Sequence, residues 1–162
     1  MEEKNNNVSS LKQQDIRKYL VFSLEGEYFA INIMYITQII GIQSITTIPD
    51  LPNYMKGVIN LRGKIIPIMD ARLRFNKTFK EYHDRTCIII LDMSGISVGL
   101  VVDSVTEVMD LAEKDISKPP NIKKRKNNYI NGIAKAEGKV RLLLDTEKLI
   151  KDENLEEVRE IL

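Results

Sequence analysis

Residues 57–70 read GVINLRGKIIPIMD, and the same frame returns at residues 132–145 as GIAKAEGKVRLLLD. In each copy two glycines bracket a short segment, a lysine opens an apolar run, and an aspartate closes it. Positions further upstream also match, at a slightly shorter offset that one loop insertion explains: Gly26, Ile31, Ile33, Ile36 and Ile39 correspond to Gly95, Leu100, Val102, Val105 and Val108. The chain therefore consists of two copies of one small β unit.

The size of the chain bounds how these units are arranged. A chain of 162 residues leaves roughly 60–70 residues for each copy, a length at which a single hydrophobic core is marginal. We therefore expect the two units to pack closely against each other and to leave a seam between them.

Composition excludes several classes of protein. Lys and Arg number 24 against 23 Asp and Glu, so the chain has no strong overall field for nucleic acid or anionic lipid. A single cysteine permits no internal disulfide, as expected in a reducing compartment. Residues 1–7 lack the pattern of a signal peptide, and no apolar run approaches the roughly 20 residues of a membrane span. We expect a cytoplasmic protein that is not inserted in a membrane.

The first copy predicts two hairpins. Strands are expected at residues 19–24 and 28–31, then a short helical turn running into a strand over residues 33–40, then a loop over residues 41–54. The second hairpin joins residues 57–61 to 64–69, and Asp70 is a good N-cap for a short helix over residues 71–75. Because Pro67 cannot donate to a sheet ladder, we place it at an edge or a bulge.

The second copy repeats this order with additions. Strands are expected at residues 86–91 and 96–102, a long exposed loop over residues 111–128, and one C-terminal helix over residues 146–162. Residues 1–15 are polar and predicted to be disordered. Many short, evenly spaced strands with glycine turns favour small barrels over a layered α/β fold. We expect one domain over residues 16–150, with two barrel subdomains at about 19–80 and 86–145.

Catalytic motifs are not apparent. His83 has no serine or cysteine nucleophile motif beside it, and Cys87 begins an apolar strand, where a buried thiol usually acts as a small hydrophobe. One Cys and one His cannot build an ordinary zinc site. The sequence predicts neither an enzyme nor a metal or cofactor.

A basic run offers one alternative function, that of a small β-barrel nucleic-acid binder. Lys123, Lys124, Arg125 and Lys126 could contact phosphates, but aromatic residues do not interleave with them, and only Tyr129 follows. A solvated loop is the favoured interpretation.

Two signals favour a protein-binding role instead. Arg62 lies in a tight turn where a guanidinium is displayed, and its counterpart Glu137 has the opposite charge, so the turn itself does not require Arg. Ile and Val are in excess over residues 33–40 and 101–108, more than two small barrels can enclose. These stretches are candidates to line an apolar groove for an amphipathic helix at the seam.

The motifs resemble those of a known family. Residues 57–75 (GVINLRGKIIPIMDARLRF), residues 19–31, and residues 99–105 with Val108 are similar to the CheW family of bacterial chemotaxis coupling proteins, and the likeness runs from about residue 19 to 150. It implies two pseudo-repeated, intertwined five-stranded SH3-like β-barrels. It also implies a non-enzymatic adaptor, monomeric in solution, which ties the regulatory domain of the histidine kinase CheA to the tips of methyl-accepting chemotaxis receptors in membrane arrays.

The resemblance also implies contact residues. The receptor is expected in the groove between the barrels and the kinase at the barrel ends. Expected receptor contacts are Ile36, Gln38, Arg62, Ile65, Cys87, Gly99, Val105 and Val108. Expected kinase contacts are Ile45, Thr46, Ser117 and Ile122.

Overall fold

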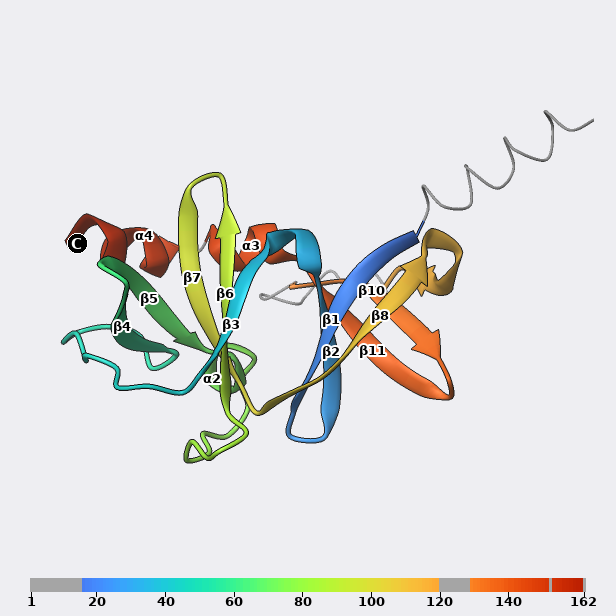
Figure 1. The fold of residues 1–162 in the computed structure, drawn as a ribbon, viewed down its shortest axis with the longest axis horizontal. Helices are drawn as coiled ribbons and strands as arrows, with labels where there is room; N and C mark the ends of the chain where they lie inside the picture. Colours follow the sequence, from blue (N-terminus) through green and yellow to red (C-terminus); the bar gives the residue numbers. More distant parts are fainter. Residues whose placement is uncertain (1–15, 120–128, 152, 162) are drawn as a thin grey trace, which may run out of the picture.

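The computed structural model describes residues 16–119, 129–151 and 153–161. The predicted tail at residues 1–15, the kinase contact Ile122 and the basic run at residues 123–126 lie outside the described residues. Short strands dominate the rest (Figure 1). The elements are β1 (Ile16–Leu24), β2 (Glu27–Asn32), the 3₁₀ helix η1 (Ile33–Tyr35), β3 (Ile36–Gly41), β4 (Met55–Leu61), β5 (Lys64–Asp70), α2 (Ala71–Arg74), β6 (Cys87–Met93), β7 (Ile96–Val102), β8 (Ser104–Ala112), η2 (Glu113–Asp115), β9 (Ile116–Ser117), β10 (Ile130–Ala136), β11 (Lys139–Leu144), α3 (Thr146–Ile150) and α4 (Glu153–Ile161).

The strands form two sheets, and each sheet contains strands from both halves of the chain. Sheet A has the order β8-β1-β2-β11-β10-β9, and sheet B has the order β3-β6-β7-β5-β4. Under the internal repeat, β8, β1, β2, β11 and β10 correspond to β3, β6, β7, β5 and β4, so the two sheets have the same strand order. Each sheet takes one hairpin from one half of the chain and its other main strands from the other half. The predicted fold class, a mainly β chain of two intertwined repeats, is confirmed.

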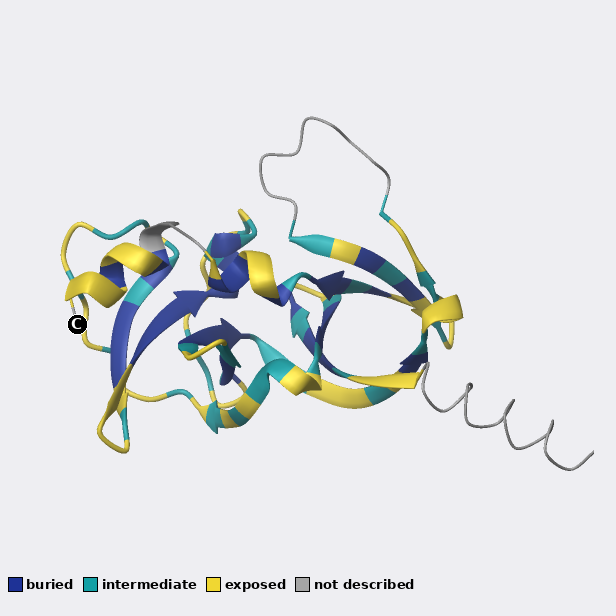
Figure 2. Cartoon of the chain, turned by 90° about the horizontal axis from the view of Figure 1, so that it is seen from above, coloured by how far each residue is buried: buried dark blue, intermediate teal, exposed yellow. Residues whose placement is uncertain are grey.

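Pairing within the sheets repeats as well. β2 runs parallel to β11, and its counterpart β7 runs parallel to β5. The edge strands of sheet A, β8 and β9, follow each other in sequence through η2, which curls the sheet into the ring seen end-on in Figure 2. In sheet B the segment between edge strands β3 and β4 adds a bridge from Thr46 to Val58.

The repeated hairpin turns explain the shared glycines. In the β4–β5 turn Arg62 and Gly63 both have positive φ (54° and 87°), and in the β10–β11 turn Glu137 and Gly138 do the same (53° and 72°). Two left-handed residues in a two-residue loop define the type I′ turn, whose twist matches that of the flanking strands.

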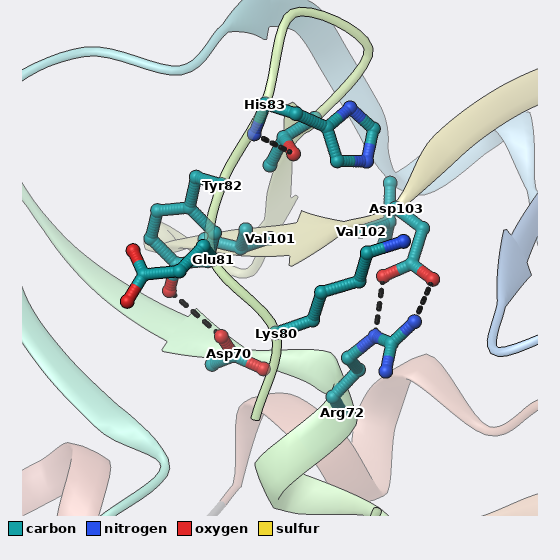
Figure 3. Close-up of a pocket in the computed structure, with 10 residues that line it drawn as sticks. Asp70, Arg72, Lys80, Glu81, Tyr82, His83, Val101, Val102 and Asp103 are labelled. Atoms are coloured by element: carbon teal, nitrogen blue, oxygen red, sulfur yellow. Dashed lines mark hydrogen bonds and ion pairs between the residues drawn. The ribbon is translucent and has the colours of Figure 1, made fainter. Parts of the chain in front are cut away.

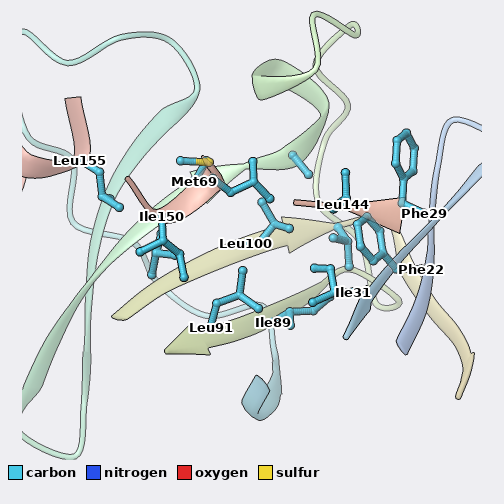
Figure 4. Packing of buried hydrophobic residues seen from close by; sticks show 14 of the residues in the cluster. Phe22, Phe29, Ile31, Met69, Ile89, Leu91, Leu100, Leu144, Ile150 and Leu155 are labelled. Atoms are coloured by element: carbon cyan, nitrogen blue, oxygen red, sulfur yellow. The ribbon is translucent and has the colours of Figure 1, made fainter. Parts of the chain in front are cut away.

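Successive side chains along each strand point to opposite faces of the sheet, and this alternation divides the hydrophobic core into three clusters. Val21 of β1 and Ile88 of β6 point into the interiors of sheets A and B, respectively. Their neighbours Phe22 and Ile89 point the other way, into a cluster shared by both sheets. Figure 4 shows this shared core, to which we refer as the seam core. The seam predicted from the size of the units is therefore present.

Two predictions about the sheets are wrong in detail. Leu111, predicted to open a long exposed loop, is 2% exposed in strand β8, because it packs into the interior of sheet A. Pro67 lies in the interior strand β5, not at a sheet edge, and the bulge beside it is in β4 between Met55 and Gly57. It is tolerated because the ladder with β7 begins one residue later, at Ile68.

The predicted single C-terminal helix is two helices. α3 ends at Ile150, and α4 begins at Glu153. Leu149 and Ile150 of α3 and Leu155 and Val158 of α4 are all buried in the seam core. The domain boundaries expected from the sequence stay predictions.

Candidate protein-binding site

The seam between the sheets is a packed core and not an open groove. Phe22 of β1, Leu91 of β6 and Leu100 of β7 are at most 1% exposed there (Figure 4). A partner can therefore reach only the rim of the seam.

Two edge strands define one side of this rim. The chain crosses between sheets twice in this region, through η1 from β2 to β3 and through the single residue Asp103 from β7 to β8. Each crossing delivers the chain to an edge strand, β3 of sheet B or β8 of sheet A, and both strands therefore begin at the junction between the sheets.

Exposed aliphatic side chains occupy equivalent positions on these two strands. Ile39 is 42% exposed and pairs with Ile89, and Val108 is 57% exposed and pairs with Leu20. Directly paired residues share one face of a sheet, and both Ile89 and Leu20 belong to the seam core. The internal repeat thus places two matching apolar side chains at the surface of the seam core.

Three predicted receptor contacts lie in the same region. Ile36 of β3, Cys87 of β6 and Val105 at the start of β8 are half-buried against the seam core. We call the set of five residues the seam rim: Ile36, Ile39, Cys87, Val105 and Val108.

Ile39 is a residue that the predicted site lacked. The signal that could have found it was present, because the repeat aligns Ile39 with Val108 and Ile36 with Val105. Choosing both members of each equivalent pair would have included it.

Gln38 and Gly99 face away from the rim. A bulge between Ile36 and Gln38 pairs Gln38 with Ile90, whose side chain points into sheet B. Gly99 is buried, and a Cβ there would approach Ile68 Cδ1 to 2.5 Å and Ile88 Cγ2 to 2.8 Å. The glycine leaves room for those two isoleucines in the barrel interior. As receptor contacts, Gln38 and Gly99 stay predictions.

Arg62 and Ile65 lie on a different part of sheet B. Both belong to the β4–β5 hairpin, which is at the opposite end of the strand order from β3. Arg62 is exposed, and Ile65 is 41% exposed. The turn is held by Asn60, whose Oδ1 accepts a hydrogen bond from the Gly63 N–H at 2.8 Å. As receptor contacts, both residues stay predictions.

Two of the predicted kinase contacts, Thr46 and Ser117, occupy equivalent positions in the two units. Thr46 bridges to Val58 through two backbone hydrogen bonds of 2.9 Å, and Ser117 pairs with Ile133, the repeat counterpart of Val58. Thr46 and Ser117 are exposed at sheet edges, and Ile45 is half-buried against the interior of sheet B.

A polar cluster joins the two sheets beside the crossing at Asp103 (Figure 3). Arg72 of α2 donates to both carboxylate oxygens of Asp103, which also accepts from the backbone N–H of Glu25 at 2.9 Å. Nearby, the Tyr82 hydroxyl donates to Asp70 at 2.7 Å. The hollow among these residues measures about 10 Å³, room for about one water molecule. The cluster therefore stabilises the junction and is too small for a substrate.

The pKa shifts in this cluster follow from its contacts. Burial acts to raise the pKa of Asp103, but the hydrogen bonds from Arg72 and from the Glu25 N–H outweigh it and hold that pKa below its usual value. Burial, followed by the hydrogen bond to Asp70, raises the pKa of the Tyr82 hydroxyl. Asp70 also caps α2, since its Oδ1 accepts from the Leu73 N–H.

Candidate catalytic and metal-ligating residues are dispersed in the described part of the chain. His83 Nδ1 accepts a hydrogen bond from the Arg85 N–H, and the Cys87 thiol donates to the Arg85 carbonyl. Among the described residues, His, Cys, Asp and Glu side chains nowhere gather in a group of three able to hold a metal ion. Within that same part, none of the helices has the length and apolar character needed to span a membrane.

Comparison with known proteins gives a consistent result. The family model of the CheW-like domain matches residues 18–154. The chain is 33% identical to the chemotaxis protein CheW of Klebsiella aerogenes over 150 residues, which cover 91% of this chain and 90% of that protein. It is also 33% identical to the chemotaxis protein CheW of Bacillus subtilis over 138 residues, covering 85% of this chain and 88% of that protein.

A solved structure agrees with the sequence matches. The scaffolding protein TtCheW from Thermoanaerobacter tengcongensis superimposes with a TM-score of 0.78 at 34% identity, covering 85% of this chain and 94% of that one. The exchanged sheets, the seam core and these matches together lead to one conclusion: the chain belongs to the CheW-like family.

Proposed function

We propose that this protein is a chemotaxis adaptor that couples the histidine kinase CheA to the cytoplasmic tips of methyl-accepting chemoreceptors. Membership of the CheW-like family and the names of its relatives, chemotaxis and scaffolding proteins, support the adaptor role. None of these comparisons supports the nucleic-acid-binding alternative.

The observation that carries the receptor contact is the equivalence of Ile39 and Val108. Both are exposed, both stand on the seam core, and they come from different sheets. Exposed apolar side chains that stand on a packed core suit the apolar face of a helical receptor tip. A receptor lying on the seam rim would contact both sheets, so its movement would act on their relative positions.

The kinase contact is proposed at the sheet edges. Thr46 and Ser117 are exposed at matching positions in the two units. The regulatory domain of the kinase, which shares this fold according to the resemblance, would then meet either unit in a similar way.

Signal transfer in this proposal involves no covalent chemistry. A receptor state that binds the seam rim more tightly shifts the population of the bound kinase only by the difference in affinity between the two states. The protein would work in the cytoplasm, recruited as a monomer to membrane receptor arrays.

The test measures binding of the purified protein to a receptor tip fragment by calorimetry. Ile39→Asp and Val108→Asp should each weaken binding about ten-fold or more, as expected for a central apolar contact. Ile161→Asp is the matched control, because Ile161 is an equally aliphatic, 65% exposed residue on α4. Circular dichroism establishes that each variant is folded.

Other outcomes would reject parts of the proposal. Binding that is indifferent to both rim variants would place the receptor elsewhere, and Arg62→Ala then tests the β4–β5 hairpin. Failure to bind either a receptor tip or the kinase regulatory domain, together with steeply salt-dependent binding of DNA or RNA, would favour the alternative function.

A further inference from the structure

Gly41, the last residue of β3, adjoins the seam rim. It is exposed and pairs directly with Cys87, and directly paired residues share one face of a sheet. Cys87 packs against the seam core, and Ile39, two residues before Gly41, faces the same way. A side chain at residue 41 would therefore point to the same surface as Ile39 and Cys87.

Neither the backbone conformation nor the packing requires a glycine at this position. All eight glycines of the sequence lie in the described part of the chain. Five of them have positive φ, and at Gly99 and Gly132 a Cβ would lie 2.5 Å and 2.7 Å from a neighbouring side chain. Gly41 belongs to neither group, because its φ is outside the left-handed region and a Cβ there would have nothing within 4 Å beyond its chain neighbours.

The strand itself does not gain from a glycine. Glycine loses more conformational freedom on folding than other residues and has no side chain to pack, so it is depleted in strands. A glycine in a strand often marks a bulge, a bend or a place where a ligand approaches closely. The bulge of β3 lies at its other end, between Ile36 and Gln38, and the φ of Gly41 is one that other residues adopt. The close approach of a partner is the reason that remains.

The internal repeat supports this interpretation. The counterpart of the Gly41–Cys87 pair in sheet A is the pair of Asp110 with Lys18. There both side chains are exposed, and Lys18 Nζ lies 3.3 Å from Asp110 Oδ1. The repeated unit therefore accepts a side chain at this position, and the lack of one is specific to sheet B.

We propose that Gly41 is a specificity-determining residue of the receptor site. An apolar side chain of the receptor tip occupies the space that any side chain at residue 41 would fill. It is apolar because the neighbours of Gly41 on this face are the aliphatic Ile39 and the half-buried Cys87. This inference rests on the proposed function and adds which residue selects among receptor helices.

The experiment compares side chains of increasing size at residue 41. Gly41→Ala should weaken binding of the receptor tip fragment about three-fold and Gly41→Val about ten-fold or more, measured by calorimetry, because each fills more of the space. Gly41→Val should be at least as stable as the wild type in thermal unfolding, because the space is open and valine favours strands.

A matched control adds the same side chain elsewhere. Lys135→Val places valine at an exposed position of β10, which does not carry any residue of the seam rim. This variant should bind the receptor tip fragment as the wild type does.

A complementary change in the receptor fragment separates a filled space from a structural effect. Each apolar residue of the fragment is truncated to alanine in turn. One truncation should weaken binding to the wild type and restore binding to Gly41→Val, because it removes the side chain that the valine displaces.

The Cys87 thiol reports on the same place independently. It is the single cysteine of the chain, and it is half-buried and paired with Gly41. Because alkylation requires access to the thiol, a saturating amount of the receptor fragment should slow alkylation of wild-type Cys87 by iodoacetamide several-fold.

Three results would overturn the proposal. They are binding by Gly41→Val as tight as that of the wild type, a loss of binding that no truncation of the fragment reverses, and an alkylation rate that the fragment does not change. If Ile39→Asp and Val108→Asp weaken binding nevertheless, the receptor site stands and only the role of Gly41 fails. If the wild type does not bind the fragment, the proposed receptor contact fails together with this inference.

Discussion

The Arg72 guanidinium donates two hydrogen bonds to the Asp103 carboxylate, from Nε to Oδ1 at 2.7 Å and from Nη2 to Oδ2 at 2.5 Å. Asp103 is the only residue between β7 of sheet B and β8 of sheet A, so this pair fixes the chain where it crosses between sheets. The repeat counterparts of the two residues are Glu147 and Met34, which cannot form such a pair. Among the described residues, this ion pair therefore has no counterpart at the equivalent crossing through η1.

Breaking this pair should destabilise the fold substantially. Arg72→Met keeps the aliphatic stem but leaves the partly buried Asp103 carboxylate without its guanidinium partner, with the Glu25 N–H still bound to it, so we expect a loss of about 2–3 kcal/mol in urea unfolding. Lys18→Met, at the exposed pair with Asp110, is the control and should cost less than about 0.5 kcal/mol. Equal effects of the two substitutions would contradict the role of Asp103 at the junction.

The same pair predicts a pH dependence. The pKa of Asp103 is lower in the folded state than in the unfolded chain, so its stabilisation is fully present above about pH 4 and is lost as pH falls through the folded value. The difference in unfolding free energy between wild type and Asp103→Asn should shrink as the pH is lowered from about 5 toward 2. A difference that stays constant over this range would show that ionisation of Asp103 does not contribute.

Gly57 should be far less tolerant of substitution than Gly138. Gly57 has φ +136°, and a Cβ there would lie 2.0 Å from the Thr46 carbonyl oxygen. Gly57→Ala should therefore break the Thr46–Val58 bridge and cost about 3 kcal/mol or more. Gly138 has a positive φ but open space around it, so Gly138→Ala should cost about 1–2 kcal/mol. Because Thr46 is a proposed kinase contact, Gly57→Ala should also weaken kinase binding, measured by calorimetry, if the variant folds.

A compensating change should rescue Gly99→Ala. The added methyl group meets the ends of Ile68 and Ile88, and such overpacking typically costs about 1–3 kcal/mol. Adding Ile68→Val removes the atom that would come closest, Cδ1, so the double variant should recover part of the loss in thermal unfolding. Additive losses in the double variant would mean that the strain arises from the backbone.

Neither half of the chain should fold alone. Fragments of residues 1–80 and 81–162 each lack strands that both sheets require, so each should show little β structure by circular dichroism. Mixing the fragments should restore β structure and the NMR spectrum of the seam core. A folded spectrum from either fragment alone would refute the exchange of hairpins as an obligate feature.

Much of the fold was predictable, because it is encoded in a repeated local pattern. The Gly-Lys-Asp frame located both β4–β5 and β10–β11, and Asp70 was recognised as a helix cap from its position after an apolar strand. The predictions were wrong where tertiary contacts, and not the local sequence, determine the secondary structure. Leu111 lies in a polar stretch but completes the interior of sheet A, and the α3–α4 break is not visible in an apolar stripe that continues through both helices.

The site was predictable only in part, for a physical reason. The face of a sheet to which a side chain points depends on register, and a bulge after Ile36 turns Gln38 toward the interior of sheet B and Ile39 toward the seam. Nothing in the local sequence marks that bulge. The equivalence of Ile39 and Val108, in contrast, can be read from the repeat alone.

The parallel pairing of β2 with β11 has a consequence for synthesis of the chain. All five strands of sheet B lie between residues 36 and 102, so they leave the ribosome together, whereas β1 and β2 must wait for β11 at residues 139–144. Because domains assemble as their strands emerge, we expect sheet B to form first, with the N-terminal hairpin held open until translation is nearly complete. A chaperone that binds the nascent chain would then bind at the unpaired edge of β2.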